Sequence, residues 1–239
     1  MSAGFLRMFN RSVWILGLIV SLTIVGGCAQ GPSWKMSDLS WFNKKKKETE
    51  ELGPKIAAPA DRVKAMQELA EKSKEMSQEE KERHAIELAR GIQHEEDAIL
   101  RQQVLRTLAV LPCPVTTAVL TAAVSDTDAD VRVVCCDAWA HHGGPDAVKV
   151  LCGVLNSDTD LDVRLAAARA LGVVGDKAAI ETLGTALDDK DPAMQHRVIV
   201  SLHKITGKDF GDNVNTWRDY VHGGTPEELS VAEKLKRYF

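Results

Sequence analysis

An internal repeat constrains this chain more than any other feature of its sequence. The phrase Asp130-Val131-Arg132 recurs as Asp162-Val163-Arg164, which gives a period of about 32 residues. In each copy, Ala and a large apolar residue follow six residues after the Arg. With the same frame one period earlier and one period later, these pairs are Thr107-Leu108, Ala138-Trp139, Ala170-Leu171 and Ser201-Leu202. A period in the thirties, built from two short helical patterns, predicts an α-solenoid whose helix pairs bury their apolar faces by stacking.

Apolar residues at helical spacing predict the helices of this solenoid. The expected helices cover 99–111, 115–124, 131–140, 146–155, 163–173, 179–187 and 192–205. Two charged helices precede them, one with Asp61 as its N-cap and one opened by a capping box of Ser77 and Glu80. We therefore predict an all-α fold, an α-solenoid of about four helix pairs with helical caps at both ends.

The repeat phrase has a mechanical interpretation. Asp130 and Asp162 are expected to cap the second helix of a pair, and Val131 and Val163 are expected to enter the core. The small residues Ala138, Ala167 and Ala170 allow neighbouring helices to approach closely, while Trp139 and Leu171 fill the space behind them.

The phrase resembles the HEAT-like repeat of the phycocyanobilin-lyase type, over roughly residues 78 to 205. The run from Asp162 to Gly172 matches it almost throughout. This resemblance implies that Arg132 and Arg164 pair with loop acids and tie loops to helices, rather than bind a ligand. The acids at hand are Asp126, Asp128, Asp158 and Asp160. In the fourth unit Gln195 stands where the Arg is expected, which puts this tie in doubt at the end of the array.

The N-terminus resembles a bacterial lipoprotein signal. Arg7 and Arg11 precede an apolar run over 13–25, which is shorter than the roughly 20 residues of a membrane-spanning helix. Val25-Gly26-Gly27-Cys28 is similar to a lipobox, which implies cleavage after residue 27 and lipid on Cys28. An uncleaved anchor helix and a plain secretory signal are the alternatives. Ala29 is not the Asp that retains such proteins in the inner membrane, so the resemblance favours the outer membrane.

The predicted domains follow from these signals. Residues 1–27 form the signal peptide, 28–60 a lipid-anchored flexible tether, 61–205 the solenoid and 206–239 a C-terminal helical cap. Within the tether, an aromatic cluster over 34–42 precedes the cations Lys44 to Lys47. This cluster is expected to be part of a solvated stalk, and contact with a membrane surface is the alternative.

Enzymatic chemistry finds little support in the sequence. Di-iron hydroxylases built of HEAT repeats carry several His-Glu pairs, whereas His94-Glu95 is the single such pair here. His141 and His142 precede two glycines, where a helix C-terminus favours cations. No phosphate loop, nucleophile elbow or HExxH motif occurs. We expect no catalytic, metal or cofactor site, although an enzyme of the HEAT-like lyase or metal-dependent type remains the alternative.

The five cysteines are Cys28, Cys113, Cys135, Cys136 and Cys152, and their spacing matches no zinc site. Cys135 occupies the repeat position of Ala167, which predicts a small packing residue. The adjacent Cys135 and Cys136 point about 100° apart on a helix and do not bond each other. A bridge from Cys113 or Cys152 to one of them is left open.

The tail after the last repeat carries three aromatic residues, Phe210, Trp217 and Tyr220. They are expected to close the open end of the core, and an aromatic interaction patch is the alternative. A final helix is predicted with Thr225 and Glu228 at its start and Lys234, Lys236 and Arg237 at its end.

Together, these features predict a lipid-anchored cell-envelope scaffold that binds another envelope protein or peptide and reaches the membrane through lipid on Cys28. The net charge of −4 argues against nucleic acid as a partner. An envelope protein that works by self-assembly is a further alternative.

Overall fold

The computed structural model describes residues 58–230 and 232–233. The chain divides into two units, Met1–Lys55 and Ile56–Phe239, and every described residue belongs to the second unit. The predicted signal peptide, Cys28, the aromatic cluster over 34–42 and nearly all of the predicted tether therefore lie outside the described residues. The end of the predicted final helix, with Lys234, Lys236 and Arg237, also lies outside them.

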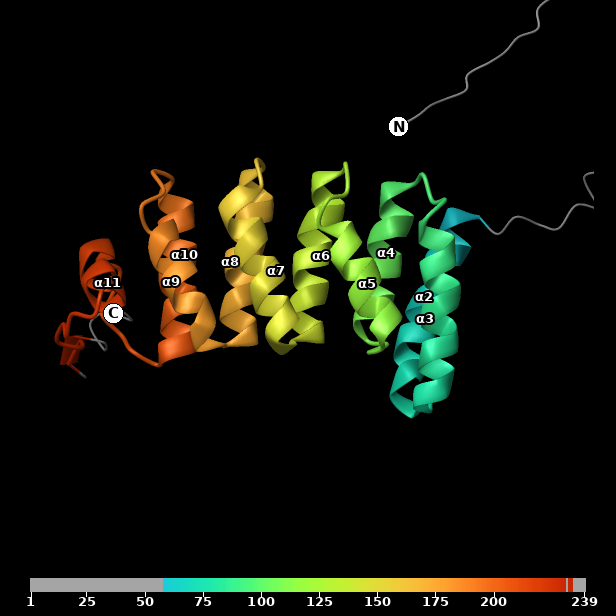
Figure 1. The fold of residues 1–239 in the computed structure, drawn as a ribbon, viewed down its shortest axis with the longest axis horizontal. Coiled ribbons are helices and arrows are strands. Elements are labelled where there is room, and N and C mark those ends of the chain that lie inside the picture. The colour runs from blue at the N-terminus through green and yellow to red at the C-terminus, as the bar shows by residue number, and fades with distance from the viewer. Residues whose placement is uncertain (1–57, 231, 234–239) are drawn as a thin grey trace, which may run out of the picture. The chain divides into compact units, whose positions relative to one another are not determined.

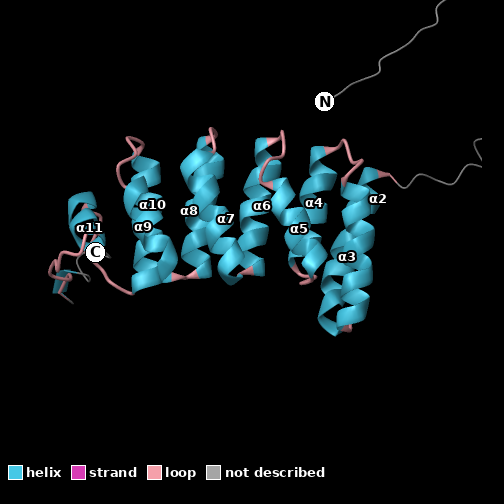
Figure 2. Cartoon of the chain, in the orientation of Figure 1, coloured by secondary structure: helices cyan, strands magenta, loops and turns pink. Residues whose placement is uncertain are grey.

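The described residues form helices and no strand (Figure 2). The α-helices are α2 (Pro59–Lys72), α3 (Gln78–Ile92), α4 (Ala98–Ala109), α5 (Pro114–Ala123), α6 (Ala129–His142), α7 (Gly144–Ser157), α8 (Leu161–Val174), α9 (Ile180–Ala186), α10 (Pro192–Thr206) and α11 (Val214–Val221). Two short 3-10 helices, η2 (Ser73–Glu75) and η3 (Lys177–Ala179), lie after α2 and before α9. The prediction of an all-α fold is confirmed.

The helices alternate between two layers. We call α2, α4, α6, α8 and α10 the even layer, in which each helix packs on the next, and α3, α5, α7, α9 and α11 the odd layer (Figure 1). Four consecutive pairs, α3–α4, α5–α6, α7–α8 and α9–α10, each contribute one helix to each layer. The extra helices α2 and α11 lengthen one layer each, at opposite ends of the chain. The predicted α-solenoid is confirmed.

The core lies between the layers and is built from the repeated positions. Val131, Val163, Trp139 and Leu171 have no exposed surface, and Trp139 donates its indole N–H to the carbonyl of Leu120 at 3.2 Å. Small residues bring the even helices close together, most sharply between α8 and α10. A Cβ on Gly172 would lie 2.7 Å from Oγ of Ser201. The repeat phrase is therefore mainly a packing rule for the even layer.

A second, smaller cluster fills the N-terminal end of the core. It comprises Met66, Ala85, Leu100, Val104, Leu108, Leu111 and Cys113. These residues come from α2, α3, α4 and the segment that leads to α5. The end helix α2 contributes one buried side chain, Met66, and is otherwise rich in charge, as the polar end of a repeat array requires.

Among the predicted caps of α3, α6 and α8, one is confirmed and two are wrong. Ser77 and Glu80 form the expected capping box at the start of α3. Asp128 and Asp160, rather than Asp130 and Asp162, are the N-caps of α6 and α8. The helices begin a residue before the predicted caps, so Asp130 and Asp162 lie in the first turn, where their negative charge still suits the helix dipole.

The predicted N-cap at Asp61 is also wrong. The first described helix begins at Pro59, with Ala58 as an N-cap that makes no side-chain hydrogen bond, and Asp61 lies in the first turn. Proline at the first helical position has its φ angle fixed near the helical value and lacks the donor that a cap would satisfy, so the helix can begin before the acid.

The final helix begins later than predicted. Residues 224–230 are not helical, and Glu228 instead forms an ion pair with Lys208 at 2.6 Å. Ser230 and Glu233 make the reciprocal bonds of a capping box, with 2.8 Å from the Ser230 N–H to the Glu233 carboxylate. The helix start is therefore five residues beyond Thr225. In the span from residue 58 to 233 apart from 231, no helix combines the length and apolar character needed to cross a membrane.

Candidate interaction surface

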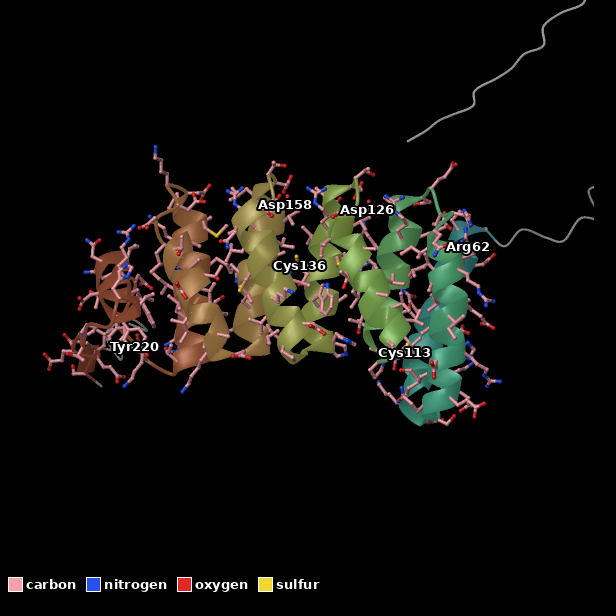
Figure 3. The ribbon with its side chains drawn as sticks, viewed as in Figure 1. Arg62, Cys113, Asp126, Cys136, Asp158 and Tyr220 are labelled. Carbon is pink, nitrogen blue, oxygen red and sulfur yellow. The ribbon has the colours of Figure 1, made fainter. Side chains whose placement is uncertain are left out.

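The loops within the helix pairs share one local design. Each contains an acid whose side chain accepts the backbone N–H two residues later, so the loop is fixed before the next helix begins. The four acids are Glu95, Asp126, Asp158 and Asp189, and their bonds to the N–H groups of residues 97, 128, 160 and 191 measure 3.2, 2.9, 2.9 and 2.9 Å. Arg62, Asp126 and Asp158 lie along the same edge in Figure 3, which we call the loop rim.

Arginines connect neighbouring loops along this rim. Arg101 donates two bonds to Asp126, at 2.9 and 2.8 Å, and Arg132 donates two to Asp158, at 2.8 and 3.0 Å. Arg62 of α2 also pairs with Glu95, through a single contact. Each arginine reaches the acid of the next pair, so the ion pairs form a ladder from one end of the described solenoid towards the other.

The last ion pair of the ladder is looser than the others. Arg164 makes a single contact with Asp189 at 3.4 Å, and the two side chains are 23% and 28% exposed. The corresponding values for Arg132 and Asp158 are 14% and 9%. A cavity of about 250 Å³ adjoins the Arg164 pair. The partner of Arg164 is Asp189, an acid that the sequence analysis did not include among the candidates.

Three of the ladder arginines, Arg101, Arg132 and Arg164, also bind the loop that precedes their own helix. Arg132 donates to the carbonyl of Asp126 at 2.9 Å, and Arg164 donates to that of Asp158 at 3.2 Å. Gln195 donates to the carbonyl of Asp189 at 2.8 Å, so it keeps this bond although it is not an arginine. The fourth unit lacks only the ion pair to the loop acid of a following unit, which the arginines make in the earlier units. These side chains hold loops to helices, which leaves little of their charge for a ligand.

The ion pairs of the ladder shift the pKa values of the groups that form them. Burial favours a raised pKa for Asp158, but hydrogen bonds from Arg132 and the Asp160 backbone, with the charge of Arg132, hold the pKa below its usual 3.8. The same balance, set by Arg101, lowers the pKa of Asp126. The pKa of Arg132 rises because its side chain donates to Asp158. These pairs therefore stay ionised at neutral pH.

The other large surface is the outer face of the even layer. Its residues recur at equivalent positions of the repeat, in rows that run from helix to helix. One row is Gln102, Val133, Leu165 and His196, the next is Arg106, Asp137, Arg169 and Val200, and a third is Val110, His141, Val173 and Lys204. The Arg169–Asp137 ion pair, at 2.6 Å, joins two neighbouring members of one row, on α6 and α8. Nothing in the described chain covers this face.

The three aromatic residues of the tail lie together. The rings of Phe210 and Trp217 are 4.9 Å apart, and those of Phe210 and Tyr220 are 5.1 Å apart. Phe210 and Trp217 are 5% and 1% exposed, while Tyr220 is half-buried. The Trp217 indole donates to the carbonyl of Gly211 at 2.8 Å. Only Tyr220 retains surface that a partner could contact.

The histidines weighed for metal chemistry are placed apart in the fold. Glu95, next to His94, holds Arg62 and the Asp97 N–H, so its carboxylate is part of the ladder. His142 has its Nε2 atom 3.1 Å from Oγ1 of Thr117 and its ring edge-to-face with Trp139 at 5.6 Å. No group of three or more potential metal ligands lies together within the described part of the chain. The sequence offered no signal for the His142–Thr117 contact, which depends on how α6 packs on α5.

The four cysteines of the described solenoid are free, and the bridge left open from Cys113 or Cys152 is not formed. Cys135 and Cys136 are fully buried, and the Cys135 thiol donates to the carbonyl of Leu120 at 3.2 Å. Burial raises the pKa of Cys136 to about 12 and that of Cys135 well above its usual value. Both thiols stay protonated and unreactive. Figure 3 places Cys113 at the edge opposite the loop rim.

Comparison with known proteins agrees with this architecture. A family model described as HEAT repeats matches residues 86–172 and 154–213, which together span more than half of the chain. No curated protein matches the chain. The matched range begins in α3 and ends just before α11, so it contains the loop ladder from Glu95 onward and the outer face of α4, α6, α8 and α10.

Proposed function

Because the chain belongs to the HEAT-repeat family, we propose that it is a non-catalytic scaffold of the cell envelope, anchored by lipid on Cys28, which binds another envelope protein or peptide on its solenoid surface. The observation that supports the binding role most is the uncovered outer face of the even layer. An extended array of parallel helices presents side chains at a regular spacing, which is how helical-repeat proteins contact long partners.

The way the charges of the loop rim are used supports the same proposal. The arginines and acids of the ladder bind one another, so the rim is a structural element that keeps the stack rigid. A rigid stack loses little conformational entropy when it binds a partner, which favours affinity. The buried thiols of Cys135 and Cys136 are protonated, and Glu95 is held by Arg62, so none of these groups supports an enzymatic role.

The anchoring part of the proposal is supported by the sequence. Val25-Gly26-Gly27-Cys28 at the end of an apolar run would place several acyl chains on one residue, and each buried methylene adds about 0.8 kcal/mol to membrane affinity. Ala29 favours the outer membrane, with the solenoid facing the periplasm or the exterior.

Two experiments with the full chain test these parts separately. Metabolic labelling with a radioactive fatty acid, comparing wild type with Cys28→Ala, should label the wild type alone; equal labelling of both would overturn the anchor. Crosslinking in intact cells, followed by affinity purification under denaturing conditions, should capture one discrete envelope protein in amounts comparable to the bait. If the wild type captures none, the scaffold proposal fails.

A further inference from the structure

The last even helix, α10, contains cations and, like α4, no acid. Between Pro192 and Thr206 it carries His196, Arg197, His203 and Lys204 and no acid, in a chain whose net charge is −4. The odd-layer helices α7, α9 and α11 each contain an acid. A helix without any acid in an acidic protein produces a local region of positive potential.

The exposed cations of α10 continue a surface that begins on α8. We call this surface the basic–apolar face, and it consists of Leu165, Arg169, Val173, His196, Val200 and Lys204. Along each helix its residues are four apart, so they share one stripe, and the two stripes occupy equivalent repeat positions on neighbouring helices. Val173 is 58% exposed, one of two large apolar residues of the described chain that are so open to solvent.

The cations of this face are not consumed by ion pairs within the protein. His196 and Lys204 are exposed, and neither has an ion-pair partner among the residues that the structure describes. Arg169 binds Asp137, but the two side chains are 43% and 52% exposed, and an exposed pair of this kind contributes little. This is the reverse of the loop rim, where every arginine of the ladder is held by a carboxylate.

We infer that the basic–apolar face of α8 and α10 binds a protein segment in which acidic side chains flank aliphatic ones. This inference rests on the proposed scaffold function and names the partner chemistry of one part of its surface. Carboxylates of the segment pair with Lys204 and Arg169, and also with His196 when its imidazole carries a proton. Aliphatic side chains of the segment cover Val173, Leu165 and Val200. The segment therefore removes apolar surface from water and also pairs its carboxylates with the cations of the face.

A protein segment fits better than the other polyanions that a basic face could attract. Nucleic acid is held chiefly through phosphate contacts, and binding requires a broad basic patch. Here the few cations alternate with valine and leucine, so they form no continuous basic track for a phosphate backbone. Anionic membranes are likewise expected to bind this face weakly, because it has so few unpaired cations.

The test measures binding of synthetic peptides to the full chain in detergent solution. The probe is a helical peptide with glutamates on both sides of a leucine stripe, and the control peptide has lysine in place of each glutamate. We expect the glutamate peptide to bind and the lysine peptide to bind at least about tenfold more weakly. His196→Glu combined with Lys204→Glu should weaken binding of the glutamate peptide about tenfold or more, and Val173→Thr should weaken it by a smaller factor.

A matched variant separates the site from general charge repulsion. Lys149→Glu combined with Thr185→Glu changes exposed residues of α7 and α9 by the same total charge, with His neutral, and should leave the affinity unchanged. Thermal unfolding checks that all variants fold. Equal affinity of both peptides, equal weakening by both double variants, or no binding of the glutamate peptide would overturn the inference. Preferential binding of single-stranded DNA over the glutamate peptide would do so too, as would binding of the Cys28→Ala protein to anionic vesicles that is lost in the His196→Glu, Lys204→Glu variant.

The cell crosslinking experiment distinguishes this inference from the scaffold proposal. If the wild type captures its envelope protein and the His196→Glu, Lys204→Glu variant captures as much, the scaffold proposal stands and the assignment of the face is wrong. If the wild type captures nothing while the peptide result holds, the basic–apolar face binds acidic segments but the scaffold proposal fails.

Discussion

The middle of the solenoid and its C-terminal end use the same repeat positions in different ways. Between α6 and α8, the ion pair of the ladder is bidentate and mostly buried, because Arg132 donates two hydrogen bonds to Asp158. Between α8 and α10, the ion pair is single and loose, and the helices are held by a buried contact between them, where Ser201 donates to the Ala168 carbonyl at 2.8 Å next to Gly172. The middle is thus secured by electrostatics at the rim, and the end by close backbone packing.

The difference teaches that the end of a repeat array has a separate stability. In a solenoid each unit contacts only its neighbours, so the energy of each interface can be perturbed almost independently. The α9–α11 end has one neighbour, a looser ion pair and an aromatic plug of Phe210, Trp217 and Tyr220. We expect it to open before the middle does.

The largest expected effect comes from the two buried tryptophans. Trp139→Ala removes a fully buried side chain in the middle and should lower the free energy of unfolding of the whole solenoid by about 3–5 kcal/mol. Trp217→Ala should instead expose the C-terminal end while the middle stays folded. Hydrogen exchange checks this, with loss of amide protection confined to roughly α9–α11 in Trp217→Ala. Uniform loss of protection in both variants would show that the solenoid unfolds as one unit.

A smaller effect is expected from the ladder itself. Asp158→Ala leaves two donor groups of Arg132 without their acceptor and should cost about 1–3 kcal/mol, because the pair is mostly buried. Asp189→Ala should cost about 1 kcal/mol less. Both changes also free one backbone N–H, at residues 160 and 191, so the difference between them isolates the ion pair. Denaturant unfolding measures it, and equal costs would mean that the looser geometry at Arg164 has no energetic meaning.

Helix packing at the end can be tested with two glycines. Gly172→Ala would place a Cβ against Ser201 of α10 and should destabilise by about 1–3 kcal/mol. Gly153→Ala is the matched control, because Gly153 is an exposed residue of α7 with nothing within 4 Å of its Cβ position, and it should stabilise by about 0.5–1 kcal/mol. Chemical denaturation of both variants checks the signs. A neutral Gly172→Ala would mean that α8 and α10 separate at little cost.

The sequence predicted the middle of the molecule better than its ends. The repeat phrase identifies Val131, Trp139 and Leu171 as core residues because burial alternates with the helical period, which is a local signal. The ion pairs are different. Arg132 meets an acid 26 residues later, and Arg164 meets Asp189 rather than an acid of its own loop. Such partners depend on how far one helix pair is displaced from the next, which no local pattern specifies.

The predicted caps failed for a related reason. Each of these loops contains acids at alternate positions, such as Asp126, Asp128 and Asp130, and all three are suitable cap residues by type. The choice falls on Asp128 because Asp126 accepts its N–H and holds it in the extended conformation that an N-cap adopts. Gln195 shows the converse case. It departs from the phrase yet keeps the bond to its own loop, since an amide N–H suffices for a carbonyl acceptor.

The smallest effect is expected in the acid dependence of stability. Because Arg132 and the Asp160 N–H hold the folded pKa of Asp158 below 3.8, its ionised form stabilises the fold above that pH. The stabilisation is lost as pH falls from about 4 through the folded pKa. The unfolding free energy of wild type should therefore decline more steeply below pH 4 than that of Asp158→Asn, which does not titrate. Asp158→Asn should be less stable at pH 7 and converge on wild type in acid; parallel curves would show that this ion pair does not contribute to the acid sensitivity.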